Sequence, residues 1–155
     1  MIIRRVERGD IDHFVEIYIE AYRGYEEYAY TSLKDIRGYF KWLYGRDRDG
    51  FFVAEIEEPV GFSACDTNWF SSMERTKVAE LHELFVRKEF RGKGIASKLM
   101  ERSVEYGIER GRRIMGLWVG EKNEPAKKFY RKHGFRESGK MGKWVRMTRM
   151  LHDQA

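Results

Sequence analysis

A short apolar segment in this chain leads through a glycine-containing turn directly into an amphipathic helix, and this order of elements limits the possible folds to a few. Residues 81–86 read Leu-His-Glu-Leu-Phe-Val, and residues 91–96 read Arg-Gly-Lys-Gly-Ile-Ala. Gly92 and Gly94 permit a tight turn in which successive backbone N–H groups point to one side. The following helix leaves its first N–H groups without intrahelical partners and places its positive dipole end there. The segment therefore predicts a backbone site for a diphosphate group.

The spacing of the glycines separates this turn from two common phosphate-binding motifs. A dinucleotide-binding fingerprint would need Gly or Ala three residues after Gly94, where the chain has Ser97. A P-loop would need four residues between its glycines and then Lys followed by Ser or Thr, a run that the sequence does not contain. What remains is Arg-x-x-Gly-x-Ala at residues 91–96, after an apolar segment that ends at Val86.

This pattern resembles motif A of the GNAT superfamily of N-acetyltransferases, in which the turn holds the pyrophosphate of acetyl-coenzyme A (acetyl-CoA). Residues 123–130 read Asn-Glu-Pro-Ala-Lys-Lys-Phe-Tyr, and Gly134 and Phe135 follow. They resemble the second half of the GNAT signature, Asn-x-x-Ala-x-x-Phe-Tyr and then Gly-Phe, at the family's spacing. Because both motifs occur in the right order within residues 79–140, the chain is identified as a member of this superfamily by resemblance.

The hydrophobic pattern predicts a single domain, residues 1–155, with alternating strands and helices. Asp10 is expected to cap the first helix, and Gly111 to end the third. The resemblance implies an α/β (α+β) fold: a GNAT-like mixed, mostly antiparallel sheet of about six to seven strands, with helices on both faces. We expect strands at 2–6, 51–56, 60–65, 79–86, 114–119, 135–139 and 144–150, and helices at 10–22, 33–43, 97–110 and about 125–133.

The distribution of charge and the cysteine content indicate which ligands and which cellular compartment suit this chain. Residues 1–86 contain 11 Lys or Arg and 17 Asp or Glu, whereas residues 87–155 contain 19 and 8. A basic second half suits a polyanionic cofactor and an acidic first half suits a cationic amine, although solvated helix faces of mixed sign explain the pattern equally well. Cys65 is the sole cysteine, and neither a signal peptide nor a long apolar run is present, so we expect a cytoplasmic protein that does not bind membranes.

The resemblance implies acetyl-CoA as the cofactor and involves no metal. In the family, backbone groups of the strand before the turn pair with pantetheine, the turn binds the pyrophosphate, and the second motif completes the site. Carried over position by position, the cofactor residues are Leu84, Phe85, Val86, Arg91, Gly92, Lys93, Gly94, Ile95, Ala96, Ser97, Asn123 and Tyr130.

Tyr130 has two interpretations. It matches the family's general acid, which would give a proton to the departing thiolate. It also lies on one helical face with Ala126, Phe129 and His133, where it could be a core residue with its hydroxyl bonded to the backbone. The family match favours the first interpretation. Asn123 could likewise be a helix cap, which is compatible with contact to pantetheine.

The general base has three candidates on the strand before the turn, namely Glu80, His82 and Glu83. Alternation puts Glu80 and His82 on one face and Glu83 on the other, unless a β-bulge intervenes, as the family commonly shows here. His82 needs no pKa shift to act near neutrality, whereas a glutamate needs a pKa raised by burial. The sequence does not decide which of these three residues is the general base.

The sequence does not identify the acceptor, and it leaves two functions other than acetyl transfer as alternatives. The acceptor is a small-molecule amine or an amine of a protein or peptide, and residues 22–30, with four tyrosines and two glutamates, could form its pocket together with Trp69 and Phe70. A homodimer is one assembly that the sequence allows. A non-catalytic acyl-CoA sensor is the alternative function. A nucleic-acid binder ranks last, because no recognition motif accompanies the basic charge.

Overall fold

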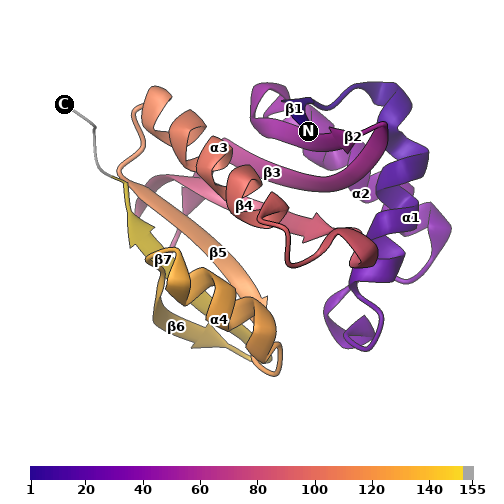
Figure 1. Ribbon diagram of the computed structural model, residues 1–155. Coiled ribbons are helices and arrows are strands. Elements are labelled where there is room, and N and C mark those ends of the chain that lie inside the picture. The colour runs from indigo at the N-terminus through magenta and orange to yellow at the C-terminus, as the bar shows by residue number, and fades with distance from the viewer. Residues whose placement is uncertain (152–155) are drawn as a thin grey trace.

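The structure, a computed structural model, describes residues 1–151 and is built around one mixed β-sheet (Figure 1). Within these residues, the sheet has seven strands in the order β1-β2-β3-β4-β5-β7-β6, and only β4 and β5 pair in parallel. This confirms the expected fold class. The strands are β1 (Ile2–Arg5), β2 (Phe51–Ile56), β3 (Glu58–Ser71), β4 (Thr76–Val86), β5 (Ile114–Gly120), β6 (Arg136–Met141) and β7 (Trp144–Met150).

Helices cover both faces of the sheet. The helices α1 (Ile11–Ala21) and α2 (Leu33–Arg46) lie on one face, and α3 (Ile95–Glu109) and α4 (Glu124–Lys132) lie on the other (Figure 1). Each pair closes its own apolar core. Phe14 and Phe40 are centres of the α1/α2 core, whereas Leu99 and Met100 lie in the α3/α4 core. No helix in residues 1–151 combines the length and apolar character needed to cross a membrane.

Local sequence explains most helix ends. Ser32 caps α2 by accepting a hydrogen bond from the Asp35 N–H, and Gly111, with φ of 78°, follows the end of α3. The expected cap at Asp10 is different. Asp10 precedes α1, but its carboxylate accepts hydrogen bonds from the Arg4 guanidinium and from the Glu7 N–H instead. The neighbouring strand supplies a charged donor, which binds a carboxylate more strongly than a neutral N–H does.

The hairpin of β3 and β4 is longer than expected. β3 continues to Ser71 and β4 begins at Thr76, whereas the hydrophobic pattern placed these limits at Cys65 and Ala79. Polar residues in the extension are buried because the fold supplies partners for them. Thr67, for example, donates hydrogen bonds from its N–H and its hydroxyl to Asp47. Alternation of apolar residues alone does not reveal such a strand.

Two irregularities of β4 create space in the sheet. Ala64 pairs with Glu83 and Cys65 pairs with Leu81, so His82 is an extra residue in a β-bulge. On its other side, β4 pairs with β5 only at Ala79 and Glu80. The two parallel strands therefore diverge beyond Glu80, and the sheet opens between them.

Candidate active site

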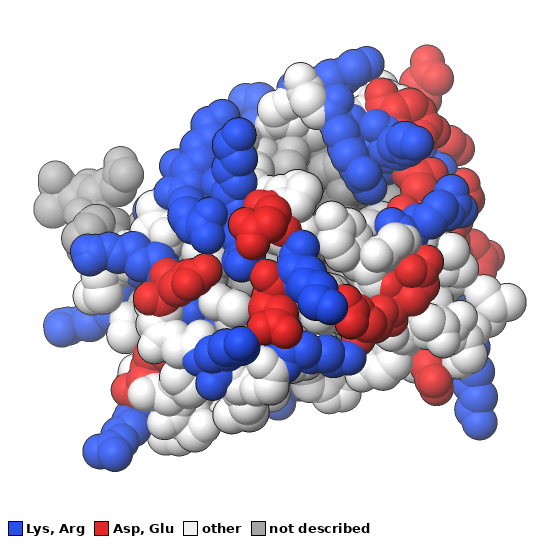
Figure 2. Space-filling view, turned by 90° about the horizontal axis from the view of Figure 1, so that it is seen from below, with Lys and Arg blue, Asp and Glu red and all other residues white. Residues whose placement is uncertain are grey.

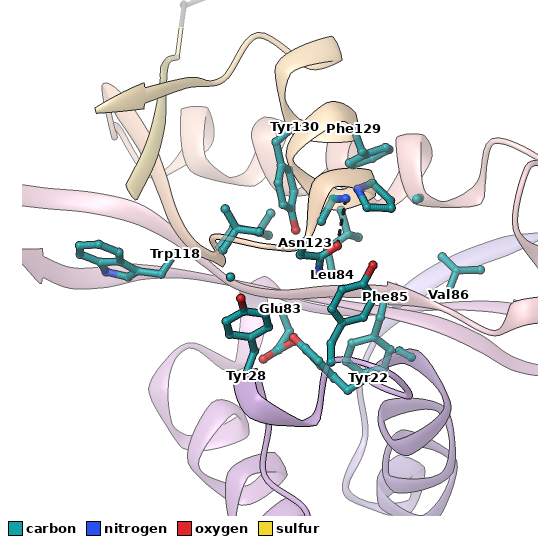
Figure 3. Close-up of a pocket in the computed structure, with 18 of the residues that line it drawn as sticks. Tyr22, Tyr28, Glu83, Leu84, Phe85, Val86, Trp118, Asn123, Phe129 and Tyr130 are labelled. Carbon is teal, nitrogen blue, oxygen red and sulfur yellow. Dashed lines mark hydrogen bonds between the residues drawn. The ribbon is translucent and has the colours of Figure 1, made fainter. Parts of the chain in front are cut away.

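A cavity of about 410 Å³ lies where β4 and β5 diverge, and it reaches through the sheet. Figure 3 shows Tyr130 and Phe129 of α4 on one side of the strands and Tyr22, Tyr28 and Glu83 on the other. The lining comprises Ala21, Tyr22, Tyr25, Tyr28, Leu81, His82, Glu83, Leu84, Phe85, Val86, Arg91, Ala96, Trp118, Val119, Gly120, Asn123, Pro125, Ala126, Phe129, Tyr130 and Trp144. The cavity thus has one end on the α3/α4 side and one on the α1/α2 side.

The glycine turn has the geometry that the sequence predicts. Gly92 and Gly94 adopt φ values of 76° and 80°, a region in which a Cβ would be strained. The first hydrogen bond of α3 runs from the Lys98 N–H to the Gly94 carbonyl, with an N···O distance of 3.1 Å. The N–H groups of residues 95–97 therefore have no helical partner and are available to an anion.

Some side chains of the turn and the start of α3 line the cavity, and others contact the rest of the protein. Arg91 and Ala96 line the cavity, and the Arg91 Nε donates a hydrogen bond to the Val86 carbonyl. Ile95 is buried in the α3/α4 core. The Ser97 hydroxyl lies 3.1 Å from Nε2 of His133, at the end of α4. Gly92, Lys93 and Gly94 lie outside the cavity lining and make up the turn that precedes α3.

Backbone groups on the edge of β4 that faces β5 have no strand partner among the described residues beyond Glu80, although the Val86 carbonyl accepts a hydrogen bond from Nε of Arg91. Leu84, Phe85 and Val86 line the cavity, and within residues 1–151 no strand pairs with this edge beyond Glu80. An extended ligand with amide groups could bind such an edge as an added strand does.

The second motif places two residues at the cavity. The Asn123 side chain caps α4 by accepting a hydrogen bond from the Ala126 N–H, and the residue also lines the cavity. The Tyr130 hydroxyl points toward the strands (Figure 3), and no group in residues 1–151 forms a hydrogen bond with it. A core tyrosine normally has such a partner. Burial, and secondarily the charge of Glu83, raises the pKa of Tyr130 above its ordinary value.

Glu83 has the most unusual environment of the three candidate bases. Its Oε1 accepts a hydrogen bond from the Tyr22 hydroxyl and its Oε2 accepts one from the Tyr39 hydroxyl, both with O···O distances of 2.6 Å. Burial raises the pKa of Glu83 to about 7, although the two hydrogen bonds act in the opposite direction. A carboxylate with this pKa can exchange protons near neutrality.

The bulge at His82 brings all three candidates to the α1/α2 side, so that simple alternation is wrong here. Glu80 lies outside the cavity lining, and its Oε2 is 2.7 Å from the Arg146 guanidinium, which is fully buried. His82 reaches the cavity wall, but its Nε2 lies 3.0 Å from Asp66, and its ring is packed between Trp42 and Trp69. Of the three, Glu83 is the one that lines the cavity with both carboxylate oxygens held by tyrosine hydroxyls.

Other expectations for the acceptor pocket need correction. Of the expected acceptor residues, three line the cavity, namely Tyr22, Tyr25 and Tyr28. The others do not, namely Glu26, Glu27, Tyr30, Trp69 and Phe70. Trp69 and Phe70 belong to the extended β3. Sequence reasoning missed Tyr39, which reaches Glu83 from the middle of α2, and Trp144, which follows the β6–β7 turn. No local motif marks either residue.

Charged side chains are distributed unevenly over the face of the molecule seen in Figure 2. Figure 2 shows Lys and Arg side chains flanking a hollow near the upper edge of the view, with Asp and Glu side chains below it. Within residues 1–151, no set of three or more His, Cys, Asp or Glu side chains is arranged to hold a metal ion. Glu83 is suited to proton transfer, and the N–H groups at the start of α3 are suited to binding an anionic group.

Known proteins share both the sequence and the fold of this chain. The profile of the acetyltransferase (GNAT) family matches residues 11–135. An uncharacterized N-acetyltransferase of Archaeoglobus fulgidus is 57% identical over 145 residues, which cover 92% of this chain and 99% of that protein. A crystal structure from Pyrococcus horikoshii OT3 superposes with a TM-score of 0.88 at 37% identity and covers 97% of this chain and 98% of that one.

A more distant structural neighbour carries a ligand. The crystal structure of an N-acetyltransferase from Thermoplasma acidophilum, in complex with coenzyme A, superposes with a TM-score of 0.74. The two sequences are 20% identical, and the superposition covers 96% of this chain and 98% of that one. At this identity the likeness concerns the fold.

Proposed function

The chain belongs to the acetyltransferase (GNAT) family, and from this premise we propose that it transfers an acetyl group from acetyl-CoA to a primary amine by direct attack in a ternary complex. One observation carries the proposal beyond family membership. The buried carboxylate of Glu83, with a pKa of about 7, lies in the wall of a cavity that reaches through the sheet. Two substrates could therefore approach each other from opposite faces.

The described residues fit acetyl-CoA at the α3/α4 end. The unpaired edge at Leu84–Val86 suits the amide groups of pantetheine, and the N–H groups at the start of α3 suit the diphosphate. Arg91 adds a positive charge in the cavity wall. The coenzyme A complex of the Thermoplasma neighbour supports this assignment. When bound there, acetyl-CoA supplies a thioester carbonyl carbon for attack and a sulfur atom as the leaving group.

Glu83 acts as the general base in this proposal. With a pKa of about 7, its carboxylate is partly ionised at neutral pH and takes a proton from the ammonium form of the acceptor. The hydrogen bonds from Tyr22 and Tyr39 fix the orientation of the carboxylate. A backbone N–H near Phe85 or Val86 polarises the carbonyl without help from a side chain.

Tyr130 acts as the general acid. Because its pKa is raised, its hydroxyl is protonated at neutral pH and can give its proton to the sulfur as the carbon–sulfur bond breaks. The ammonium group loses two protons as the carbon–nitrogen bond forms. Glu83 takes the first, and the second restores Tyr130 through solvent, so that one proton is released overall.

Thiol release from acetyl-CoA, measured with a panel of amines, polyamines, amino acids and peptides, tests the proposal. Glu83→Gln is expected to lower kcat by about 100- to 10,000-fold, with partial recovery at high pH, where the free amine is more abundant. Glu80→Gln is the matched control, because it makes the same change on the same strand outside the cavity. It should keep kcat near that of the wild type per folded molecule.

Two results would contradict the proposal. If Glu83→Gln retains wild-type kcat and pH profile, Glu83 is not the base. If acetyl-CoA binds but no amine in the panel stimulates thiol release, the chain is an acyl-CoA sensor instead.

A further inference from the structure

The cavity end on the α1/α2 side is walled by aromatic rings. Tyr22, Tyr25 and Tyr28 come from the end of α1 and the segment after it, and Trp118 and Trp144 come from β5 and β7. Figure 3 shows Tyr22 and Tyr28 on the same side of the strands as Glu83. Aromatic faces attract an ammonium group and also pack against a flat apolar body.

On the side away from the cavity, Tyr28 of the aromatic wall is fixed by a hydrogen bond and by ring packing. The Tyr28 hydroxyl accepts a hydrogen bond from the Lys122 N–H at 3.0 Å, and the Tyr28 ring centroid lies 5.4 Å from that of Trp144. A Cβ on Gly120 would approach the Tyr28 ring to 2.4 Å, so only glycine allows this contact. The rings therefore form a preorganised surface.

Full charges are scarce in the wall. Among the described lining residues, Glu83 is the one with a carboxyl group and Arg91 the one with a guanidinium group, and none is a lysine. Arg91 belongs to the α3/α4 end, where its Nε donates to the Val86 carbonyl. The nearby Lys143 is exposed outside the rings of Tyr28 and Trp144, and its ammonium donates to the Glu27 carbonyl. The guanidinium of Arg146 lies over the Trp118 ring, outside the lining, and it already pairs with Glu74 and Glu80. Within the described lining, the α1/α2 end thus has no free Lys or Arg to pair with an anionic group.

We infer that the acceptor is an aralkylamine, a primary amine on a short chain attached to an aromatic ring, with no carboxylate near the amine. This inference rests on the proposed function and names its substrate class. The ammonium group would lie near Glu83 and the ring would pack against the aromatic wall. An α-carboxylate would be buried there without a cation to pair with, beside a carboxylate of the same sign, which is strongly unfavourable.

Phenethylamine and phenylalanine provide the matched test, because they differ in that carboxylate alone. With acetyl-CoA present, thiol release should show a kcat/KM at least about 100-fold higher for phenethylamine than for phenylalanine, since an unpaired buried charge opposes binding. Spermidine and a lysine-containing peptide should also be poorer acceptors than phenethylamine. Calorimetry on the enzyme saturated with coenzyme A should show binding of phenethylamine and no detectable binding of phenylalanine.

A pair of variants at Tyr25 tests the physical reason. Tyr25 is partly exposed in the wall, so substitutions there are compatible with folding, which thermal unfolding checks. Tyr25→Arg supplies a cation and should raise the kcat/KM for phenylalanine relative to phenethylamine by about 10-fold or more. Tyr25→Leu removes the ring without adding charge and should weaken phenethylamine without improving phenylalanine.

The outcomes separate this inference from the proposed function. If spermidine, the peptide or phenylalanine is the best acceptor, the inference is wrong and the acetyltransferase function stands. If no amine releases thiol and phenethylamine does not bind, both are wrong. If Tyr25→Leu improves phenylalanine as much as Tyr25→Arg does, the absence of a cation is not what excludes the carboxylate.

Discussion

At the scale of single residues, Glu83 shows two opposed effects on one carboxyl group. Burial favours the neutral form, whereas the hydroxyls of Tyr22 and Tyr39 donate to the charged form. Other groups near Glu83 are Tyr18 of α1, His82 of β4 and Tyr130 of α4. Because burial dominates, the pKa lies at about 7 instead of near 4.5.

Removal of one of the two hydrogen-bond donors to Glu83 should raise the pKa of its carboxyl group further. Tyr39→Phe deletes a hydrogen bond that lowers the pKa of Glu83, so the pKa should rise by about one unit. The pH at which kcat reaches half of its maximum should rise by the same amount, measured with one amine in both proteins. Tyr22→Phe should act in the same direction. An unchanged midpoint in both variants would show that another group limits the rate.

Tyr130 permits a test that separates chemistry from binding. Tyr130→Phe keeps the ring and removes the hydroxyl, for which no hydrogen-bond partner occurs in residues 1–151. The variant should lower kcat by about 10-fold or more and leave the dissociation constant of acetyl-CoA nearly unchanged, because a proton donor acts on the leaving group. Calorimetry and steady-state kinetics measure the two quantities. Reduced stability with unchanged kcat would favour the role of a core residue.

At the scale of elements, the turn before α3 combines backbone shape and charge. Gly94 immediately precedes α3 with φ of 80°, and no atom outside its neighbours lies within 4 Å of the position where its Cβ would be. A side chain at this position therefore costs backbone strain and extends from the turn without a clash inside the protein.

Two substitutions at Gly94 separate strain from charge. Gly94→Ala adds strain alone and should weaken acetyl-CoA binding modestly. Gly94→Glu adds the same strain together with negative charge beside the proposed diphosphate site, and binding should fall by at least about 100-fold relative to Gly94→Ala. Calorimetry with acetyl-CoA measures both affinities. Equal affinities for the two variants would place the diphosphate elsewhere.

At the scale of the whole molecule, the proposed base makes folding depend on pH. The native state holds the proton of Glu83 up to a pH of about 7, whereas the unfolded chain loses it near pH 4.5. Between these values the native state binds more protons, so the free energy of unfolding falls as pH rises. This loss is complete above pH 7.

Glu83→Gln should remove that dependence. The variant should match the wild type in stability at pH 4 and exceed it by up to roughly 3 kcal/mol at pH 8. Urea unfolding of both proteins from pH 4 to pH 8 measures the difference. Asp10, Asp66 and Glu74 have pKa values lowered by hydrogen bonds despite burial, so their contributions disappear on acidification, but equally in both proteins. A constant difference across this range would mean that Glu83 has the same pKa in the native and unfolded states, so that burial does not raise it.

The sequence alone determined the features that depend on neighbouring residues. The turn at Gly92 and Gly94, the cap at Asn123 and the strand–turn–helix order each follow from spacing within a few residues, because turns and helix ends are governed by local backbone conformation. These local patterns also carried the family resemblance, and with it the sheet and its two helical layers.

Only the tertiary structure decided which carboxylate lies in the cavity. The bulge at His82 depends on the register between β3 and β4, and a shift of one residue changes the face to which each side chain points. Tyr22 and Tyr39 lie 61 and 44 residues before Glu83 and meet it only when α1 and α2 pack on the sheet. The pKa of Glu83 results from that burial, so no local pattern could predict it.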